Sequence, residues 1–146
     1  MSNYKLIQLT NKNIPEVAIN GLLPLGSITR RVDCKSNCPT FTVSTSGADT
    51  VTLSSPGYYR IIYSISAVAT ADTALTLSLL TNGVSAYSVS ETPAAAGDTV
   101  NLTLTYMARV YPQCDNLANN NPMTVQFQTS GAITSGVGNL IIERVY

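Results

Sequence analysis

The chain has 146 residues, only 11% of which are charged, and its eight basic and eight acidic side chains give a formal net charge of zero. Without an excess of positive charge, the sequence lacks the electrostatic footprint of a nucleic-acid-binding protein. No apolar run approaches the ~20 residues that a membrane-spanning helix needs, and residues 1–5 lack the basic region and apolar block of a signal peptide, so we expect synthesis in a cytoplasm and no membrane partner.

Short segments rich in Val, Ile, Thr and Tyr, separated by turn signals, fill most of the chain. The clearest turn signals are Asn20-Gly21, Pro56-Gly57 and Asn82-Gly83. No segment keeps the spacing of an amphipathic helix, so we expect almost no helix. The predicted strands, in chain order, are residues 4–9, 16–20, 27–32, 41–44, 50–53, 56–69, 75–80, 86–90, 99–110, 123–129 and 139–146.

The strand at 56–69 has two sides that can be separated by parity, because successive side chains of a strand point to opposite faces. One side is predicted to face a core: Tyr59, Ile61, Tyr63, Ile65 and Ala67. The other side is mixed: Tyr58, Arg60, Ser64 and Ser66, interrupted by Ile62 and Val68. Sandwiches that keep apolar residues on an outer face often bury them against another subunit, so the mixed side predicts a further contact surface.

The strand at 99–110 alternates most regularly and is predicted to be central. One of its sides carries Val100, Leu102, Leu104, Tyr106, Ala108 and Val110. The Asn82-Gly83 turn predicts a hairpin between 75–80 and 86–90. Further inward positions are predicted in the last two strands: Val125, Phe127, Leu140 and Ile142. So many strands without intervening helices predict an all-β domain, either a two-sheet sandwich or a barrel.

Three motifs follow one another in an informative order. Pro56-Gly57-Tyr58-Tyr59 enters a long strand, Leu79-Leu80-Thr81-Asn82-Gly83 closes another, and Gly138-Asn139-Leu140-Ile141-Ile142 lies in the final one. Together they resemble the trimeric jelly roll shared by tumour necrosis factor (TNF) and the complement globular head. The resemblance covers residues 24–146 and implies an antiparallel two-sheet jelly-roll sandwich with little or no helix. Residues 1–23 are then expected to be an N-terminal arm or a first strand.

The segment 24–31 also resembles the opening of small stand-alone proteins of this fold from bacteria and their phages. That resemblance implies a non-enzymatic structural virion protein, a homotrimeric capsid decoration or head-fibre protein on the particle surface, made in the host bacterial cytoplasm. Its implied partners are two further copies of itself and a phage capsid or other virion protein, with no cofactor. The alternative is a trimeric tip module on a phage tail or bacterial surface that binds a host surface glycan or protein.

The resemblance implies an aromatic cluster along a threefold axis. The candidate interface residues are Tyr58, Tyr59, Tyr63, Tyr106, Arg109 and Tyr146. The alternative for the tyrosines is a core filled from one chain. The charged strand residues also have two interpretations, a polar layer at the trimer axis or simple exposure on the outer sheet; they are Arg60, Arg109, Glu143 and Arg144.

The N-terminal segment has apolar anchors at Tyr4, Leu6 and Leu9. It could attach to a neighbouring subunit or a capsid protein by strand addition, or it could be an ordinary first strand of the sandwich.

Three cysteines, Cys34, Cys38 and Cys114, form an odd set, so a complete intrachain disulfide set is impossible. Cys34 could bridge Cys38, Cys114 could meet either of them, or all three could be thiols. A zinc site is not expected, because the chain has no histidine and three thiolates leave zinc one ligand short. Catalysis is not expected either, since no histidine, closely paired carboxylates or Gly-x-Ser-x-Gly turn is present.

Overall fold

Strands dominate the computed structural model, which describes residues 4–33, 39–112 and 121–145. The described residues contain no helix, and so none long and apolar enough to span a membrane. The strands are β1 (Lys5–Ile14), β2 (Ser27–Val32), β3 (Phe41–Val43), β4 (Val51–Leu53), β5 (Gly57–Ala69), β6 (Leu75–Thr81), β7 (Val84–Glu91), β8 (Thr99–Val110), β9 (Met123–Thr129) and β10 (Ile133–Arg144).

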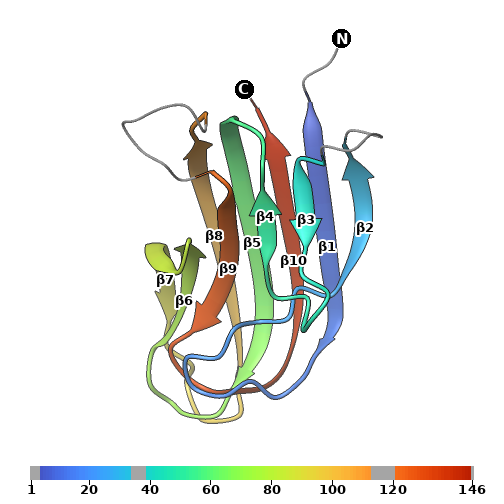
Figure 1. The fold of residues 1–146 in the computed structure, drawn as a ribbon. Helices are drawn as coiled ribbons and strands as arrows, with labels where there is room; N and C mark the ends of the chain where they lie inside the picture. The colour runs from blue at the N-terminus through green and yellow to red at the C-terminus, as the bar shows by residue number, and fades with distance from the viewer. Residues whose placement is uncertain (1–3, 34–38, 113–120, 146) are drawn as a thin grey trace.

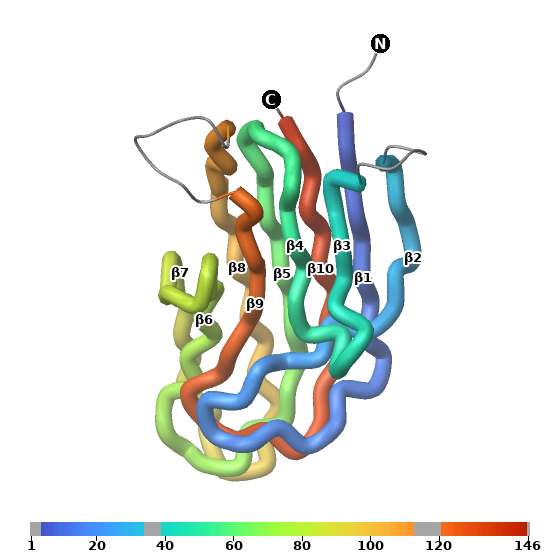
Figure 2. The backbone as a smooth tube through the Cα atoms, in the orientation of Figure 1, coloured from blue at the N-terminus to red at the C-terminus, as the bar shows by residue number. Residues whose placement is uncertain are grey.

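Two antiparallel sheets lie face to face. Sheet A has the order β2-β1-β10-β5-β8, and sheet B has the order β3-β4-β9-β6-β7. Figures 1 and 2 show sheet B in front of sheet A, with both chain ends at the upper end of the sandwich. The predicted two-sheet sandwich is confirmed.

The core lies between the sheets and is filled by alternate residues of the long strands. The inward sides predicted for β5, β9 and β10 are buried. In β8 the side that carries Val100, Leu102, Leu104, Ala108 and Val110 is buried, and Tyr106 on that side is half-exposed. The Asn82-Gly83 hairpin is also confirmed. Both residues have positive φ, 51° and 81°, as the two central residues of a type I′ turn require. Strict alternation therefore predicted the buried sides of these strands correctly. The prediction that 99–110 is a central strand is wrong, because β8 is the last strand of sheet A.

The last strand begins at Ile133, well before the predicted start at 139. Glycines are typical of turns, but Gly136 and Gly138 both lie inside β10 and pair with β5. A Cβ at Gly136 would lie 2.9 Å from the Ser66 carbonyl oxygen, and one at Gly138 would lie 2.8 Å from the Tyr63 hydroxyl. These glycines are needed for close packing within the sheet rather than for a turn.

The predicted strand at 16–20 is wrong. Only Val17 forms a bridge, with Ile133, and Asn20 has a positive φ of 59° within the turn that Gly21 N–H closes by donating to the Ala18 carbonyl. The segment between β1 and β2 crosses the lower end of the sandwich, where Leu23 and Leu25 are buried (Figure 1). Its backbone is held by Leu23 N–H donating to the Phe127 carbonyl and Leu25 N–H donating to the Ala48 carbonyl. Residues 15–26 therefore close the core without forming a strand.

Candidate functional site

The outer face of sheet A carries aliphatic side chains and an ion pair in its upper half, and hydroxyl and amide groups in its lower half. In the upper half, Ile141 of β10 pairs with Ile62 of β5, and the next row places Leu6 beside Glu143. Leu6, Ile62 and Ile141 are half-buried aliphatic side chains on a face that the described part of the chain does not cover with a further layer. We call these three residues the apolar patch.

An ion pair crosses the strands in the row of Leu6, one row above Ile62 and Ile141. Arg60 Nε lies 3.2 Å from Glu143 Oε1, and the Tyr4 hydroxyl donates to Glu143 Oε2 at 3.2 Å. The Arg60 side chain is 46% exposed, so the pair lies on the surface of sheet A. Glu143 thus compensates Arg60 within one chain.

The lower half of the outer face is lined by hydroxyl and amide groups that bond to one another. Asn139 Oδ1 accepts hydrogen bonds from Gln8 Nε2 at 2.9 Å and from Thr10 Oγ1 at 3.0 Å. Ser66 Oγ of β5 donates to Asn101 Oδ1 of the neighbouring strand β8. A shallow depression of about 310 Å³ lies over this region. It contains no ionisable side chain, so it offers only neutral hydrogen-bonding groups.

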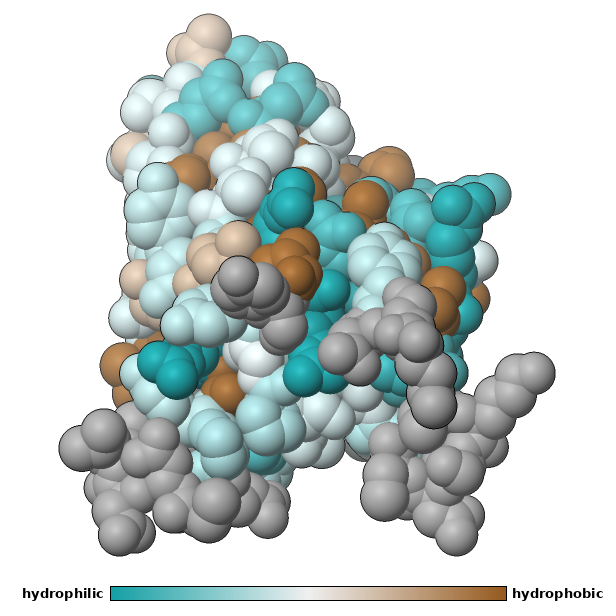
Figure 3. All heavy atoms as spheres, turned by 90° about the horizontal axis from the view of Figure 1, so that it is seen from above, coloured by the Kyte–Doolittle hydropathy of each residue, from teal (hydrophilic) through white to brown (hydrophobic). Residues whose placement is uncertain are grey.

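Aromatic and basic side chains gather where β5, β8 and β10 reach the upper end. Arg109 Cζ lies 5.2 Å from the ring centroid of Tyr58 and 4.4 Å from that of Tyr111. Arg144 ends β10 in the same row as the buried Tyr59, so it has the parity of the core side, and a cavity of about 300 Å³ opens between these strand ends. Figure 3 looks onto this end of the molecule, and outside the grey atoms it shows small hydrophobic areas scattered among hydrophilic ones.

Two of the predicted interface tyrosines lie inside the sandwich instead. Tyr59 and Tyr63 are 0% and 1% exposed within one chain, so they cannot line a contact with a neighbouring subunit. They share the inward parity of Ile61, and the alternative of a core filled from one chain applies to both. The interface prediction is therefore corrected at these two positions.

The two buried tyrosines differ in how their hydroxyl groups are satisfied. The Tyr59 hydroxyl donates to the Ser55 carbonyl at 2.6 Å, and its ring meets Phe41 edge-on at 6.1 Å. The Tyr63 ring stacks on Phe127 at 4.3 Å, but its hydroxyl has no hydrogen-bond partner within the described residues. Burial raises the pKa of Tyr59 to about 12 and also raises the pKa of Tyr63.

Tyr106 closes an open edge of the sandwich. It is half-buried on β8, the last strand of sheet A, and its ring stacks on Tyr87 of β7 at a centroid distance of 6.1 Å. Tyr87 is 46% exposed. Because β7 and β8 are edge strands of the two sheets, this pair covers the gap between them, and we call it the tyrosine edge. Tyr146, the last predicted interface residue, lies outside the described residues.

The predicted attachment arm is an interior strand. Lys5–Ile14 forms β1, which pairs with β2 on one side and β10 on the other, so it has no free edge for strand addition. Leu9 is buried in the core together with Ile7, whereas Tyr4 and Leu6 lie on the outer side. The alternative of an ordinary strand of the same sandwich is correct for this segment. Cys34, Cys38 and Cys114 all lie outside the described residues.

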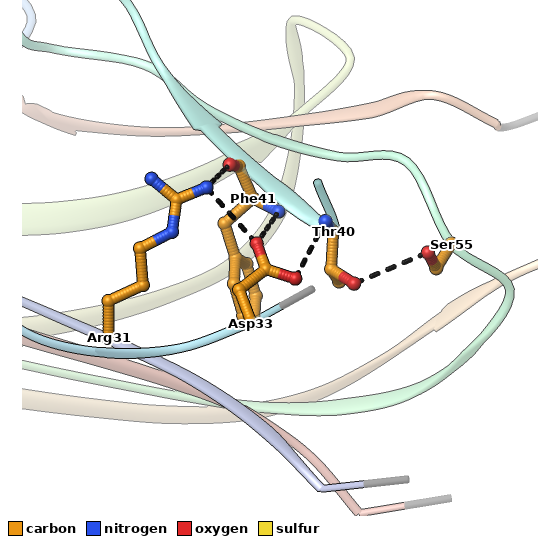
Figure 4. A network of polar contacts seen from close by, with 5 residues as sticks. All are labelled: Arg31, Asp33, Thr40, Phe41 and Ser55. Atoms are coloured by element: carbon orange, nitrogen blue, oxygen red, sulfur yellow. Dashed lines mark hydrogen bonds and ion pairs between the residues drawn. The ribbon is translucent and has the colours of Figure 1, made fainter. Parts of the chain in front are cut away.

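A polar network that the sequence did not reveal joins the two sheets at the opposite edge (Figure 4). The Asp33 carboxylate accepts hydrogen bonds from Thr40 N–H at 3.0 Å and Phe41 N–H at 3.1 Å. Arg31 Nη2 lies 3.1 Å from Asp33 Oδ2 and donates to the Phe41 carbonyl at 2.6 Å. The Asp33 side chain is only 3% exposed. The network fixes the end of β2 against the start of β3, and we call it the Asp33 clasp.

Within the part of the chain that the structure describes, no group of three His, Cys, Asp or Glu side chains could hold a metal ion.

No protein-family model and no curated protein matches the sequence. Solved structures do match it over nearly its full length. PRD1 vertex protein P5 is 15% identical, with 97% of each chain covered and a TM-score of 0.65. The globular domain of zebrafish complement 1qA protein is 10% identical, with 99% of this chain and 98% of that chain covered and a TM-score of 0.66. Eiger TNF from S. frugiperda is 6% identical, with 98% of this chain and 92% of that chain covered and a TM-score of 0.69. The protein therefore has the TNF-like jelly-roll fold that its motifs resemble.

Proposed function

We propose that this protein is a non-enzymatic structural protein of a bacteriophage virion, a homotrimer displayed on the particle surface as a capsid decoration or head-fibre protein. The observation that carries the proposal is the apolar patch of Leu6, Ile62 and Ile141 on the outer face of sheet A. Support for the virion comes from PRD1 vertex protein P5, a phage vertex protein with the same fold along 97% of both chains.

The trimer is proposed to form by packing the tyrosine edge of one subunit on the apolar patch of the next. The two surfaces differ, so the contact is heterologous, and such contacts form a closed ring when their rotation allows it. Tyr87 and Tyr106 suit this role because a phenol ring can be buried at a contact while its hydroxyl stays hydrogen-bonded. Tyr58 and Arg109, one row above the Arg60–Glu143 ion pair, then lie at the rim of the interface.

Light scattering on the purified protein tests the trimer directly. The expected mass is three times the chain mass of 15.5 kDa. Ile62→Asp and Tyr87→Asp should each give a folded monomer, because each places an unpaired carboxylate in the proposed contact. Thr52→Asp is the matched control, since Thr52 lies on β4 and points outward from sheet B. A monomeric wild-type protein, or trimers formed by both interface variants, would refute this assembly.

Particle composition tests the virion role. Peptide mass spectrometry of purified phage particles should detect the chain in a copy number divisible by three. Antibodies to the folded protein should label intact particles, since the proposal places it on their surface. Absence of the chain from purified particles would refute a structural virion role whatever its oligomeric state.

A further inference from the structure

A second concavity lies on the lower half of the outer face of sheet A, next to the depression lined by hydroxyl and amide groups. Its volume is about 580 Å³. Ser66 and Val68 of β5 and Val137 of β10 form part of its wall, and Lys12 near the end of β1 forms another part. Among the described residues that line it, Lys12 is the only charged one. We call it the Lys12 cavity.

Lys12 has no charged partner in its own chain. It is exposed, and it forms no ion pair within the described residues. The rest of the cavity wall is hydroxyl, amide and aliphatic, so nothing there offsets the ammonium charge. A cation in such a concavity favours a carboxylate as its partner.

A carboxylate in the same situation lies on the edge strand that carries Tyr87. Glu91 is the last residue of β7, and it has the parity of Tyr87, so both side chains lie on the same side of that strand. Glu91 is exposed, and in the part of the chain that the structure describes it has no ion pair either. The edge of the sandwich therefore carries an aromatic ring and, below it, one unpaired negative charge.

Strand pairing relates the level of Tyr87 to a level on sheet A. Tyr87 pairs with Leu79, and Leu79 pairs with Phe127. The Phe127 ring stacks on the Tyr63 ring of β5 at 4.3 Å. Tyr87 and Tyr63 therefore lie at about the same level along the strands, and that level includes Ile62 of the apolar patch.

The same relation places Glu91 level with the Lys12 cavity. β5 and β7 both lead to the lower end, because the Ala69 carbonyl at the end of β5 accepts a hydrogen bond at 2.8 Å from Gly97 N–H in the loop after β7. Four residues along each strand from the two tyrosines lie Glu91 and Ala67. The residues on either side of Ala67 line the Lys12 cavity.

Cyclic symmetry turns equal levels into contacts. Packing an edge of one subunit on a face of the next, side by side, sets the rotation axis along the strands. Rotation about that axis leaves the position along it unchanged, so each edge residue meets groups at its own level on the neighbour. Tyr87 then meets the apolar patch, and Glu91 meets the Lys12 cavity.

We propose that Glu91 of each subunit enters the Lys12 cavity of the next subunit and forms an ion pair with Lys12. This inference rests on the assembly proposed above and names the charged contact that fixes its register. An edge shifted along the strands would cover Lys12 and Glu91 without their partners, which is unfavourable for both charges.

Cross-linking tests the contact directly. A water-soluble carbodiimide joins a carboxylate to an amine that touches it, and the reagent takes up the water that is lost. Isotope-labelled and unlabelled subunits are refolded together before cross-linking. The expected product is a peptide pair joined through Lys12 and Glu91 in which one peptide is labelled and the other is not, because the contact lies between subunits.

Charge exchange tests its contribution. Lys12→Glu and Glu91→Lys should each weaken the trimer at least about tenfold, because each places like charges together. The double exchange should restore the affinity to within about threefold, and rising salt concentration should reduce the differences. The matched control joins Lys12→Glu to Asp72→Lys, at an exposed position between β5 and β6, and should not restore the trimer. Sedimentation over a dilution series measures the affinities, and circular dichroism shows that each variant is folded.

Two results would overturn the contact and leave the trimer intact. They are a wild-type trimer without a Lys12–Glu91 cross-link between subunits, and a double exchange that assembles no better than the single variants. A monomeric wild-type protein would refute the proposed assembly and this contact with it, and light scattering on the same samples distinguishes that case from the other two.

Discussion

The two buried tyrosines allow the same substitution to be made in two different hydrogen-bonding environments. Tyr63→Phe and Tyr59→Phe each remove one hydroxyl and leave the aromatic ring in place. Tyr63 is 1% exposed and its hydroxyl has no partner within the described residues, whereas the Tyr59 hydroxyl donates to the Ser55 carbonyl at 2.6 Å. We therefore expect the two variants to change the free energy of unfolding in opposite directions.

The magnitudes follow from the cost of burying polar groups. A buried hydroxyl without a partner is destabilising by about 1–3 kcal/mol, and a typical intramolecular hydrogen bond contributes about 0.5–1.5 kcal/mol. The Tyr63 ring keeps its stack on Phe127 after the change, and only the small volume of one oxygen beside Gly138 is vacated. Tyr63→Phe should thus raise the free energy of unfolding by about 1 kcal/mol, and Tyr59→Phe should lower it by about 1 kcal/mol.

Urea unfolding followed by circular dichroism measures both changes. At equal protein concentration and equal m-value, the midpoint should move up for Tyr63→Phe and down for Tyr59→Phe. The corresponding shifts in melting temperature are about 2–4 °C in each direction for a chain of this length. If Tyr63→Phe is destabilised as much as Tyr59→Phe, the Tyr63 hydroxyl has a partner such as a buried water, and the reasoning is refuted.

Three further predictions concern the turn at the lower end, the Asp33 clasp and alkaline pH. Gly26→Ala should lower the free energy of unfolding by about 2 kcal/mol or more, because φ is 85° and the new Cβ would collide with the Thr10 carbonyl. Gly97→Ala, at a similar φ in open space, should lower the free energy of unfolding by only about 1 kcal/mol. Equal urea midpoints for the two variants would contradict this prediction. Asp33→Ala should lower the free energy of unfolding by about 2–3 kcal/mol, because it leaves the N–H groups of Thr40 and Phe41 without an acceptor. A reducing agent should change the melting temperature little. A small effect of Asp33→Ala together with a large effect of the reducing agent would show that a disulfide holds this end. Burial raises the pKa of Tyr59 to about 12 and raises that of Tyr63, against an ordinary value of 10, so the unfolded chain loses these protons first. These two tyrosines should therefore leave the free energy of unfolding unchanged below pH 10 and lower it above pH 10, by at most about 1.4 kcal/mol per pH unit for each tyrosine. A urea midpoint that stays constant above pH 10 would contradict this prediction.

The sequence predicted the long strands well because alternation is a local property. β8 has the predicted bounds, and the buried side of β5 is the side that parity selected. The same parity could have corrected the interface prediction, since Tyr59 and Tyr63 alternate in step with Ile61, while Tyr58 does not. Where parity and the family resemblance disagreed, parity was the better guide, because it follows from the geometry of each strand.

Other features could not be predicted because they depend on contacts between distant segments. Nothing local distinguishes Gly136 and Gly138, which lie within a strand, from Gly83, which lies in a turn; the difference is the close approach of β5. The Asp33 clasp likewise depends on β2 of one sheet meeting β3 of the other, an arrangement that only the packed sandwich creates.

The apolar patch, the surface proposed for assembly, has the same origin. Leu6, Ile62 and Ile141 are isolated aliphatic positions in the sequence, each beside polar neighbours, and they become one patch because β10 is inserted between β1 and β5. Recognition on this fold therefore depends on sheet order, so substitutions that preserve the alternation of every strand can still abolish assembly or binding by changing one member of a cross-strand row.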